Sequence, residues 1–347
     1  MPRKRGAVVI GVNKTGGLPV LEASVAGAEA FAQWLAAEGF EVKTITDAKR
    51  PVTPAQIAEA IESFVTPATY HQLVIYFSGH GFWKNDAELW LLTNAPADAN
   101  AAVSWAETAE FAKDCGIPNV VIISDACRSI PNTPRALKVR GSIIFPNEEV
   151  QRNRAKVDKF MAAAMGASAY EVPIGLAGKK QNAFTHCFLR AFAAPDRDMI
   201  QDVNEDGHVI KVVPNRKLGK YLQREVARLL AAVNVQLNQA PDAEVLSDDD
   251  VYIGRAQSSP PPASVDLRGD VAEVQPPSAP TVHLRDVALM TFERALDKPQ
   301  QIAPDEMRAL EDLSQKSGFE TAIFQAGTIV SNITHFETKT GFAIVGA

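Results

Sequence analysis

The sequence predicts an α/β fold, a three-layer sandwich with a mostly parallel central sheet, followed by a small C-terminal α+β unit. Short apolar runs rich in β-branched residues alternate with segments whose apolar residues recur at helical spacing. Such alternation is typical of strand–helix–strand units, which place a parallel sheet between two helical layers. With 347 residues, 46% of them hydrophobic, the chain is long enough for about two globular domains.

Four apolar runs predict the strands of the sheet: residues 7–12, 40–46, 73–78 and 120–124. The last two lack polar alternation, as expected for parallel strands that are buried on both faces. The first run follows a basic N-terminus, but Asn13 ends it too early for a signal peptide. We therefore expect a cytoplasmic protein.

Several helix starts can be identified between these runs. The segment Thr53–Gln56 combines an N-cap, a first-turn proline and a capping-box glutamine. Ser104 and Glu107 predict a second capping box. Further helices are expected near 183–193 and 217–233, where apolar residues again recur at helical spacing.

Proline content predicts the domain boundaries. Residues 256–280 hold six of the 22 prolines, with serines among them, and predict a linker. Residues 1–255 then form one domain, and 281–347 form a small second unit of helices and two strands that turn near 339–341. We expect this C-terminal unit to bind a protein partner or to regulate the first domain.

Composition excludes several classes of function. The net charge of -6 argues against a nucleic-acid binder, which needs a basic face to neutralise phosphates. No apolar run approaches the roughly 18 residues of a membrane span, so no membrane partner is expected. Three cysteines cannot build a disulfide framework or a four-cysteine zinc site. We expect no cofactor to be required, and calcium is the one possible ligand ion.

Two polar motifs follow two of the predicted strands. One is Ser78-Gly79-His80-Gly81 and the other is Asp125-Ala126-Cys127-Arg128. Because sites in open α/β sheets form at the carboxyl ends of strands, His80 and Cys127 are expected to meet. A thiolate is a strong nucleophile and a nearby imidazole can take its proton, while the backbone N–H groups of Gly81 and Cys127 are candidate oxyanion donors. Alone, either residue would be a loop histidine or a buried small hydrophobe.

The paired motifs resemble those of the caspase–metacaspase family of cysteine peptidases, over roughly residues 6–254. The resemblance implies the caspase-like fold, with Cys127 as nucleophile and His80 as general base. It also implies that Asp125 and Ser78 line the pocket for the side chain before the cleaved bond. In metacaspase-like members an acid at the position of Asp125 receives arginine or lysine, although the further aspartate that those members often have is Gly27 here. The alternative role of Asp125 is a loop-capping carboxylate.

The segment 128–158 lacks clear periodicity and predicts a long basic loop. If the pocket accepts cationic side chains, this loop is a candidate for self-cleavage. The alternative is an ordinary solvated loop. Its basic residues are Arg128, Arg135, Lys138, Arg140, Arg152, Arg154 and Lys156.

The segment 202–207 resembles the start of a calcium loop. Asp202, Asn204 and Asp206 place oxygen ligands at alternate positions, and Gly207 suits a tight turn. The twelfth position, where a bidentate glutamate is expected, is Val213. The two interpretations are a calcium site and a plain Asx-turn loop.

Two functions follow from these observations. The first is a cysteine endopeptidase that cleaves protein or peptide substrates after arginine or lysine, in a regulated stress, cell-death or defence pathway. The second is a catalytically inactive caspase-like scaffold that recruits a partner through 281–347. The presence of both His80 and Cys127 favours the first.

Overall fold

The chain divides into two compact units, residues 1–270 and 271–347. Most of the predicted linker, and the helices expected within 281–332, lie outside the described residues. Within the second unit, β15 (Ile333–Thr338) and β16 (Phe342–Gly346) form the antiparallel pair expected there. The computed structural model describes residues 4–84, 87–131, 133–147, 154–174, 179–205, 207–233, 239–257, 333–338 and 342–346.

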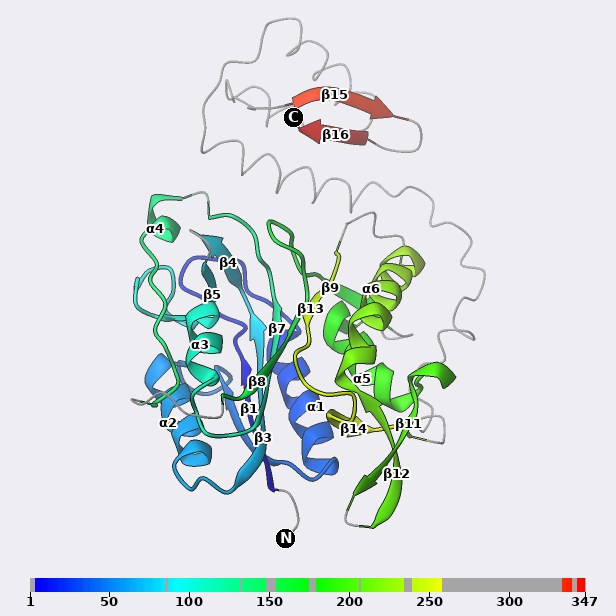
Figure 1. Ribbon diagram of the computed structural model, residues 1–347. Coiled ribbons are helices and arrows are strands. Elements are labelled where there is room, and N and C mark those ends of the chain that lie inside the picture. Colours follow the sequence, from blue (N-terminus) through cyan, green and yellow to red (C-terminus); the bar gives the residue numbers. More distant parts are fainter. Residues whose placement is uncertain are drawn as a thin grey trace, which may run out of the picture. The chain divides into compact units, whose positions relative to one another are not determined.

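A six-stranded sheet forms the centre of the first unit (Figure 1). Its strand order is β13-β8-β7-β3-β1-β2. Only β13 runs antiparallel to its neighbour in this sheet, so the predicted mostly parallel sheet is confirmed. The strands are β1 (Lys4–Gly11), β2 (Glu41–Thr46), β3 (Tyr70–Gly79), β7 (Asn119–Ala126), β8 (Lys156–Met161) and β13 (Asp242–Glu244).

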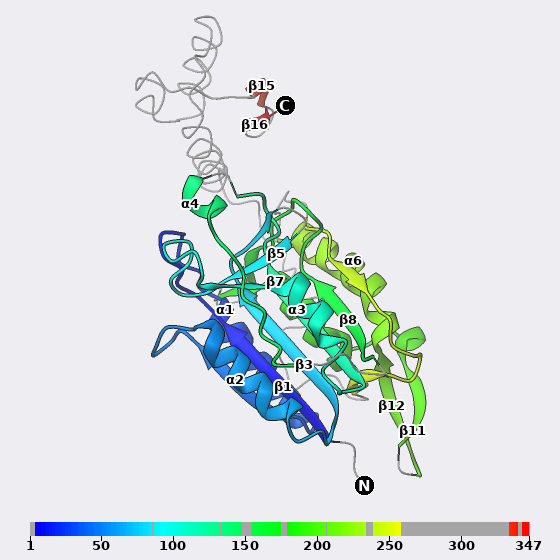
Figure 2. The same cartoon turned by 60° about the vertical axis from the view of Figure 1, so that its left-hand side comes forward.

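Helices cover both faces of this sheet, as Figures 1 and 2 show. Because side chains of a strand alternate between faces, Val9 of β1 belongs to one apolar core and Val8 to the other. The first core includes residues of α1 (Ser24–Ala37), α5 (Ala183–Ala193) and α6 (Asn215–Ala232). The second includes residues of α2 (Pro54–Val65) and α3 (Trp105–Ala112). The three predicted layers are therefore present.

The two predicted capping boxes have different outcomes. Thr53 caps α2, since its hydroxyl accepts from the N–H of Gln56 and the side chain of Gln56 accepts from the N–H of Thr53. Ser104 precedes α3 but its side chain forms no capping bond, so that prediction is wrong. The reason is tertiary, because the N–H that Glu107 would bind donates instead to the carbonyl oxygen of Ser142.

Smaller sheets extend from the central one. Beyond β3, β4 (Gly81–Lys84), β5 (Ala87–Leu91) and β6 (Ala102–Ser104) form an antiparallel sheet. The pair β9 (Glu171–Ile174) and β10 (Lys179–Asn182) leads into α5. The predicted basic loop contains a short helix, α4 (Pro134–Leu137), and ends in β8. A third sheet contains β11 (Gln201–Glu205), β12 (His208–Pro214) and β14 (Tyr252–Arg255).

Within the part of the chain that the structure describes, no helix is both long enough and apolar enough to cross a bilayer.

Candidate active site

The register of β3 and β7 brings the two predicted motifs together. These strands are parallel neighbours at the centre of the sheet, with Ser78 opposite Asp125 and Gly79 opposite Ala126. His80 and Cys127 follow this last pair directly, at the carboxyl ends of their strands. The structure therefore places the imidazole and the thiol on adjacent strand ends, as the sequence predicts.

The backbone of Gly81 packs closely against the loop that carries Cys127. A Cβ atom added to Gly81 would lie 2.5 Å from the carbonyl oxygen of Cys127 and 3.0 Å from the Cβ of Ala126. Real Cβ atoms do not approach that closely, so only glycine fits here without displacing backbone. The histidine motif and the cysteine motif are therefore in direct contact.

A backbone carbonyl orients the imidazole of His80. Its Nε2 lies 2.8 Å from the carbonyl oxygen of Pro19. A carbonyl oxygen only accepts, so Nε2 carries the proton of the neutral ring and Nδ1 keeps its lone pair. Burial lowers the pKa of His80, whereas the Pro19 bond and the carboxylate of Glu171 raise it. Burial dominates, and it favours the neutral ring that a general base requires.

Side-chain hydrogen bonds, exposed or partly buried, position the loop that carries Pro19. Asn13 begins this loop, and its side-chain oxygen accepts from the N–H of Val25 in the first turn of α1 at 2.9 Å. At the other end of the loop, the carboxylate of Glu171 accepts from the N–H groups of Glu22 and Ala23. Glu171 begins β9, so one short strand fixes the loop that orients His80.

The thiol of Cys127 contacts the backbone of Ala169. The Sγ atom accepts from the N–H of Ala169 at 3.3 Å and lies 3.5 Å from its carbonyl oxygen. Cys127 is half-buried, whereas Cys115 and Cys187 are buried. Burial raises the pKa of Cys115, and it raises that of Cys187 to about 12, which makes both poor nucleophiles near neutral pH. Cys127 is thus the most accessible of the three thiols.

A buried ion pair lies directly behind Cys127. The guanidinium of Arg128 binds the carboxylate of Glu88, and both side chains are almost fully buried. Arg128 also donates to the carbonyl oxygen of Ala163 at 3.2 Å and lies 3.4 Å from a carboxylate oxygen of Asp242 on β13. Burial raises the pKa of Glu88, and the charge of Arg128 opposes this shift. Glu88 lies in a segment without a motif, and sequence analysis missed it.

Asp125 and Ser78 lie in one buried polar cluster at the start of α5. Asp125 accepts from both the N–H and the hydroxyl of Thr185, and it thereby caps the first turn of the helix. Asn182 donates from Nδ2 to the Oγ of Ser78 at 2.6 Å. Burial raises the pKa of Asp125 to about 6, and bonds from Thr185 and Asn182 limit the shift. The capping role considered from the sequence is therefore real, and Asn182 is a member that sequence analysis missed.

Comparison with known proteins decides the family. The model of the caspase domain family matches residues 4–243. The chain belongs to the caspase domain family. Among solved structures, a protein from Geobacter sulfurreducens is 16% identical, with a TM-score of 0.47, over 73% of this chain and 100% of that one.

Caspase-1 from Spodoptera frugiperda is 13% identical to this chain, with a TM-score of 0.48, over 74% of this chain and 92% of the other. A search of curated proteins finds no match.

Two of the candidate calcium ligands, Asp202 and Asn204, lie on β11. Asp202 is opposite Lys211 and forms an ion pair with it at 2.9 Å. Asn204 accepts from the N–H of Gly207 at 3.0 Å, as in an Asx turn, and Asp206 lies outside the described residues. The described residues contain no cluster of three or more metal-binding side chains. Calcium binding stays a prediction, and a calorimetric titration without heat would remove it.

The basic residues of the segment 128–158 differ in exposure. Arg128 is buried, and Arg154 forms ion pairs with Glu110 and Asp114. Arg152 lies outside the described residues, and Lys156 belongs to β8. Arg135, Lys138, Arg140 and Arg154 are exposed. Of these, only Arg154 forms an ion pair among the described residues.

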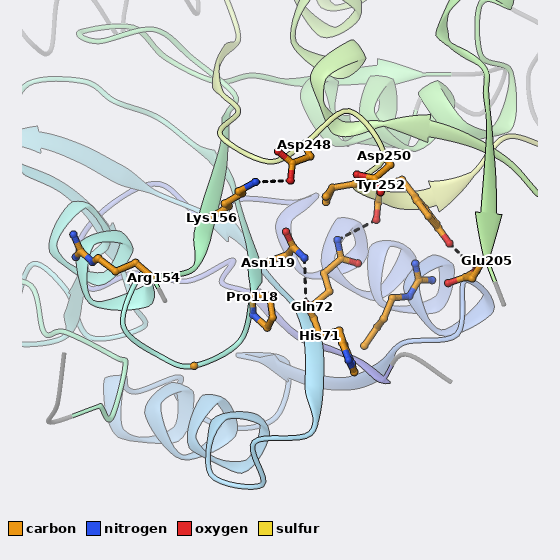
Figure 3. A pocket seen from close by; sticks show the side chains of 13 residues that line it. His71, Gln72, Pro118, Asn119, Arg154, Lys156, Glu205, Asp248, Asp250 and Tyr252 are labelled. Atoms are coloured by element: carbon orange, nitrogen blue, oxygen red, sulfur yellow. Dashed lines mark hydrogen bonds and ion pairs between the residues drawn. The ribbon is translucent and has the colours of Figure 1, made fainter. Parts of the chain in front are cut away.

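A pocket of about 590 Å³ lies at the end of the central sheet opposite to His80 and Cys127 (Figure 3). Its lining includes Arg5, Asn119 and Lys156, which begin or nearly begin their strands. Lys156 forms an ion pair with Asp248, and the guanidinium of Arg5 packs 4.2 Å from the centre of the Phe40 ring. Because His80 and Cys127 lie at the opposite strand ends, this pocket is not part of the candidate active site.

Proposed function

We propose that the chain is a cytoplasmic cysteine endopeptidase that cleaves protein or peptide substrates after arginine or lysine. Membership of the caspase domain family supports peptidase chemistry. The observation that carries the residue assignment is the register that puts His80 and Cys127 on adjacent strand ends, with Gly81 packed on Cys127. No cofactor is required by this chemistry.

Cys127 acts as the nucleophile and His80 as the base. Nδ1 of His80 takes the thiol proton, and Sγ attacks the carbonyl carbon of the peptide bond. Backbone N–H groups stabilise the resulting oxyanion, and those of Gly81 and Cys127 are the candidates. The imidazolium then gives its proton to the leaving amine, and water hydrolyses the thioester with His80 again as base.

The carboxylate of Asp125, in the buried polar cluster beside Cys127, supports the proposed preference for arginine or lysine. Asp125 lies two residues before Cys127 and Ser78 lies two before His80, so both adjoin the reacting groups. With a pKa raised to about 6 by burial, Asp125 is ionised at neutral pH. A buried carboxylate is stabilised by a cationic partner, which the substrate side chain supplies.

A cleavage-site profile tests activity and specificity together. Peptides from a denatured proteome are incubated with the full chain and with its Cys127→Ala and His80→Ala variants. We expect cleavage after arginine and lysine by the unmodified chain, and none above background by either variant. Cleavage after other residues would contradict the specificity, and cleavage by the Cys127→Ala variant would contradict the mechanism.

The scaffold alternative makes a different prediction for a thiol-reactive peptide that ends in an arginine chloromethyl ketone. A peptidase is alkylated at Cys127, and intact mass shows one added peptide. A chain that stays unlabelled by this probe, while iodoacetamide still reaches Cys127, is a scaffold.

Self-processing within 128–158 belongs to the same proposal. Arg135, Lys138 and Arg140 are exposed, whereas the exposed Arg154 is held by ion pairs, so the first three are the leading candidates among the described residues. Incubation of the pure chain is expected to give fragments cut in this segment, and the Cys127→Ala variant none. Equal fragmentation of both would contradict self-processing, as would fragmentation of neither.

A further inference from the structure

Asn182 precedes the first residue of α5 but does not cap the helix. An asparagine at this position ordinarily accepts, through its side-chain oxygen, a hydrogen bond from an amide of the first turn. Here the side chain of Asn182 forms no such bond. The N–H of Thr185 donates to Asp125 instead, at 3.2 Å. The Oδ1 atom of Asn182 is therefore left out of the usual capping role.

The donors of the surrounding cluster already have acceptors within it. Because the hydroxyl proton of Thr185 goes to Asp125, the Oγ1 of Thr185 accepts from the hydroxyl of Tyr76, 2.6 Å away. Asn182 uses Nδ2 to donate to Ser78. Among the described residues, Oδ1 of Asn182 has no hydrogen-bond partner, although Asn182 is only 6% exposed.

The cluster therefore lacks a donor for Oδ1 of Asn182, and a cation with N–H groups would supply one. A buried carbonyl oxygen without a donor loses the free energy of its bonds to water. In the described part of the chain, no lysine or arginine forms an ion pair with Asp125. A negative carboxylate and an unpartnered carbonyl oxygen together match a positively charged group with several N–H donors.

Gly27 of α1 borders the same cluster. A Cβ atom on Gly27 would lie 3.7 Å from the hydroxyl oxygen of Tyr76 and 3.9 Å from Cγ of Asn182. As a glycine, this residue adds no charge to the cluster. Asn182 therefore lies beside α1 at this point, together with the hydroxyl of Tyr76, and its amide adds an acceptor without a second negative charge.

We propose that Asn182 is a specificity-determining residue whose Oδ1 accepts a hydrogen bond from the cationic side chain that precedes the cleaved bond, beside Asp125, and that it favours arginine over lysine. This inference rests on the proposed function. A guanidinium has five N–H donors in a fixed planar fork and is weakly hydrated, so it can serve two acceptors in a buried site. An ammonium is more strongly hydrated and loses more on burial.

Binding to a chain that cannot hydrolyse the peptide tests the inference. In the full-length Cys127→Ala variant, calorimetry measures the affinity of three peptides that differ only in arginine, lysine or citrulline before the cleavable bond. Adding Asn182→Ala is expected to lower the affinity for the arginine peptide about 10- to 100-fold, and to lower the affinity for the lysine peptide less. Asn182→Asp keeps an acceptor at this position and is expected to restore the arginine affinity. An unchanged ratio of arginine to lysine affinity, or equal losses for all three peptides, would overturn the inference.

Asn215 offers a matched control. It is fully buried, donates from Nδ2 to Asp158 at 2.7 Å, and also has an Oδ1 without a partner among the described residues. Asn215→Ala therefore perturbs folding in a similar way, but it is expected to leave the ratio of arginine to lysine affinity unchanged. If Asn215→Ala lowers the ratio of arginine to lysine affinity as well, the inference is overturned, because the change would then follow from any such perturbation of the fold.

The experiments distinguish failure of the proposed peptidase function from failure of the proposed role of Asn182. If the Cys127→Ala chain binds the arginine peptide through Asn182 but the unmodified chain hydrolyses nothing, the peptidase function fails and the recognition stands. If the unmodified chain hydrolyses peptides and Asn182→Ala keeps the ratio of arginine to lysine cleavage, only the recognition fails. If the Cys127→Ala chain binds no arginine peptide, the inference is overturned.

Discussion

Gly81 and Cys127 are in backbone contact, with the position of a Cβ on Gly81 only 2.5 Å from the carbonyl oxygen of Cys127. Gly81→Ala must therefore push the two motifs apart. We expect a loss of peptidase activity of about tenfold or more, with a loss of unfolding free energy of about 1–3 kcal/mol from the overpacking. Steady-state kinetics and urea denaturation measure the two effects.

Gly27→Ala is the control for stability, because its Cβ meets only ordinary contacts of 3.7 Å and more and because alanine favours the helix. Wild-type activity in Gly81→Ala would contradict the close contact.

Glu171 acts on His80 through charge as well as through the loop that carries Pro19. Its carboxylate stabilises the imidazolium, so Glu171→Gln is expected to lower the pKa of His80. An NMR titration of the imidazole ring protons in the Cys127→Ala chain measures this shift. The control is Glu22→Gln, because Glu22 forms an ion pair with Lys180 and is not among the groups that shift His80. A pKa of His80 that stays constant or rises in Glu171→Gln would exclude this role.

Asp125 makes the free energy of unfolding depend on pH. Burial raises its pKa from 3.8 to about 6, so between these values the folded chain binds more protons than the unfolded chain. Stability then falls as pH rises through this window. Asp125→Asn removes the ionisation. It is expected to increase the free energy of unfolding by at most about 3 kcal/mol near pH 8 and by almost nothing near pH 3.5. Urea denaturation at both pH values measures the difference, and equal effects at the two would contradict the shifted pKa.

The same substitution should abolish cleavage after arginine. Asp125→Asn thus predicts a chain that is more stable and less active, a combination that general damage to the fold does not produce.

The buried pair of Arg128 and Glu88 predicts a non-additive stability effect. Arg128→Met leaves Glu88 buried without its cation and is expected to cost about 3–5 kcal/mol. Glu88→Gln, added to Arg128→Met, removes the unpaired charge and keeps an acceptor for the indole N–H of Trp105. We expect the double variant to recover part of that loss in urea denaturation. A double variant as unstable as Arg128→Met alone would contradict the coupling.

The C-terminal unit is expected to be dispensable for peptide hydrolysis. All the residues assigned to the reaction lie within residues 1–270. Deletion of 281–347 should leave kcat/KM for a small arginine peptide within about twofold. If hydrolysis disappears while circular dichroism shows a folded truncation, the C-terminal unit is part of the catalytic apparatus.

The sequence predicts the central sheet and the meeting of His80 with Cys127 for one physical reason. Uninterrupted apolar runs such as 73–77 are typical of strands that are buried on both faces, and the carboxyl ends of parallel strands lie at a common edge. Local signals also suffice for the capping box of Thr53, whose partner lies three residues away.

Groups that act through distant partners were not predictable in this way. Pro19 contributes a backbone carbonyl, which any residue type provides, and Glu171 binds amides almost 150 residues earlier in the chain. Asn182 carries the local signal of an N-cap, but Asp125 takes the amide that it would bind. The capping box predicted at Ser104 does not form for the same reason, because the N–H of Ser104 donates to the carbonyl oxygen of the distant Ser142.

If the chain cleaves after arginine, as proposed, Arg128 provides a bond in its own sequence that must stay intact, one residue after Cys127. In the native molecule that bond is protected, because the side chain is held by Glu88 and the backbone N–H and C=O bind Ala167 and Gly166. Unfolding removes this protection and turns Arg128 into an ordinary arginine in an extended chain. Under the proposed function, we therefore expect native copies to cleave unfolded copies after Arg128, beside Cys127.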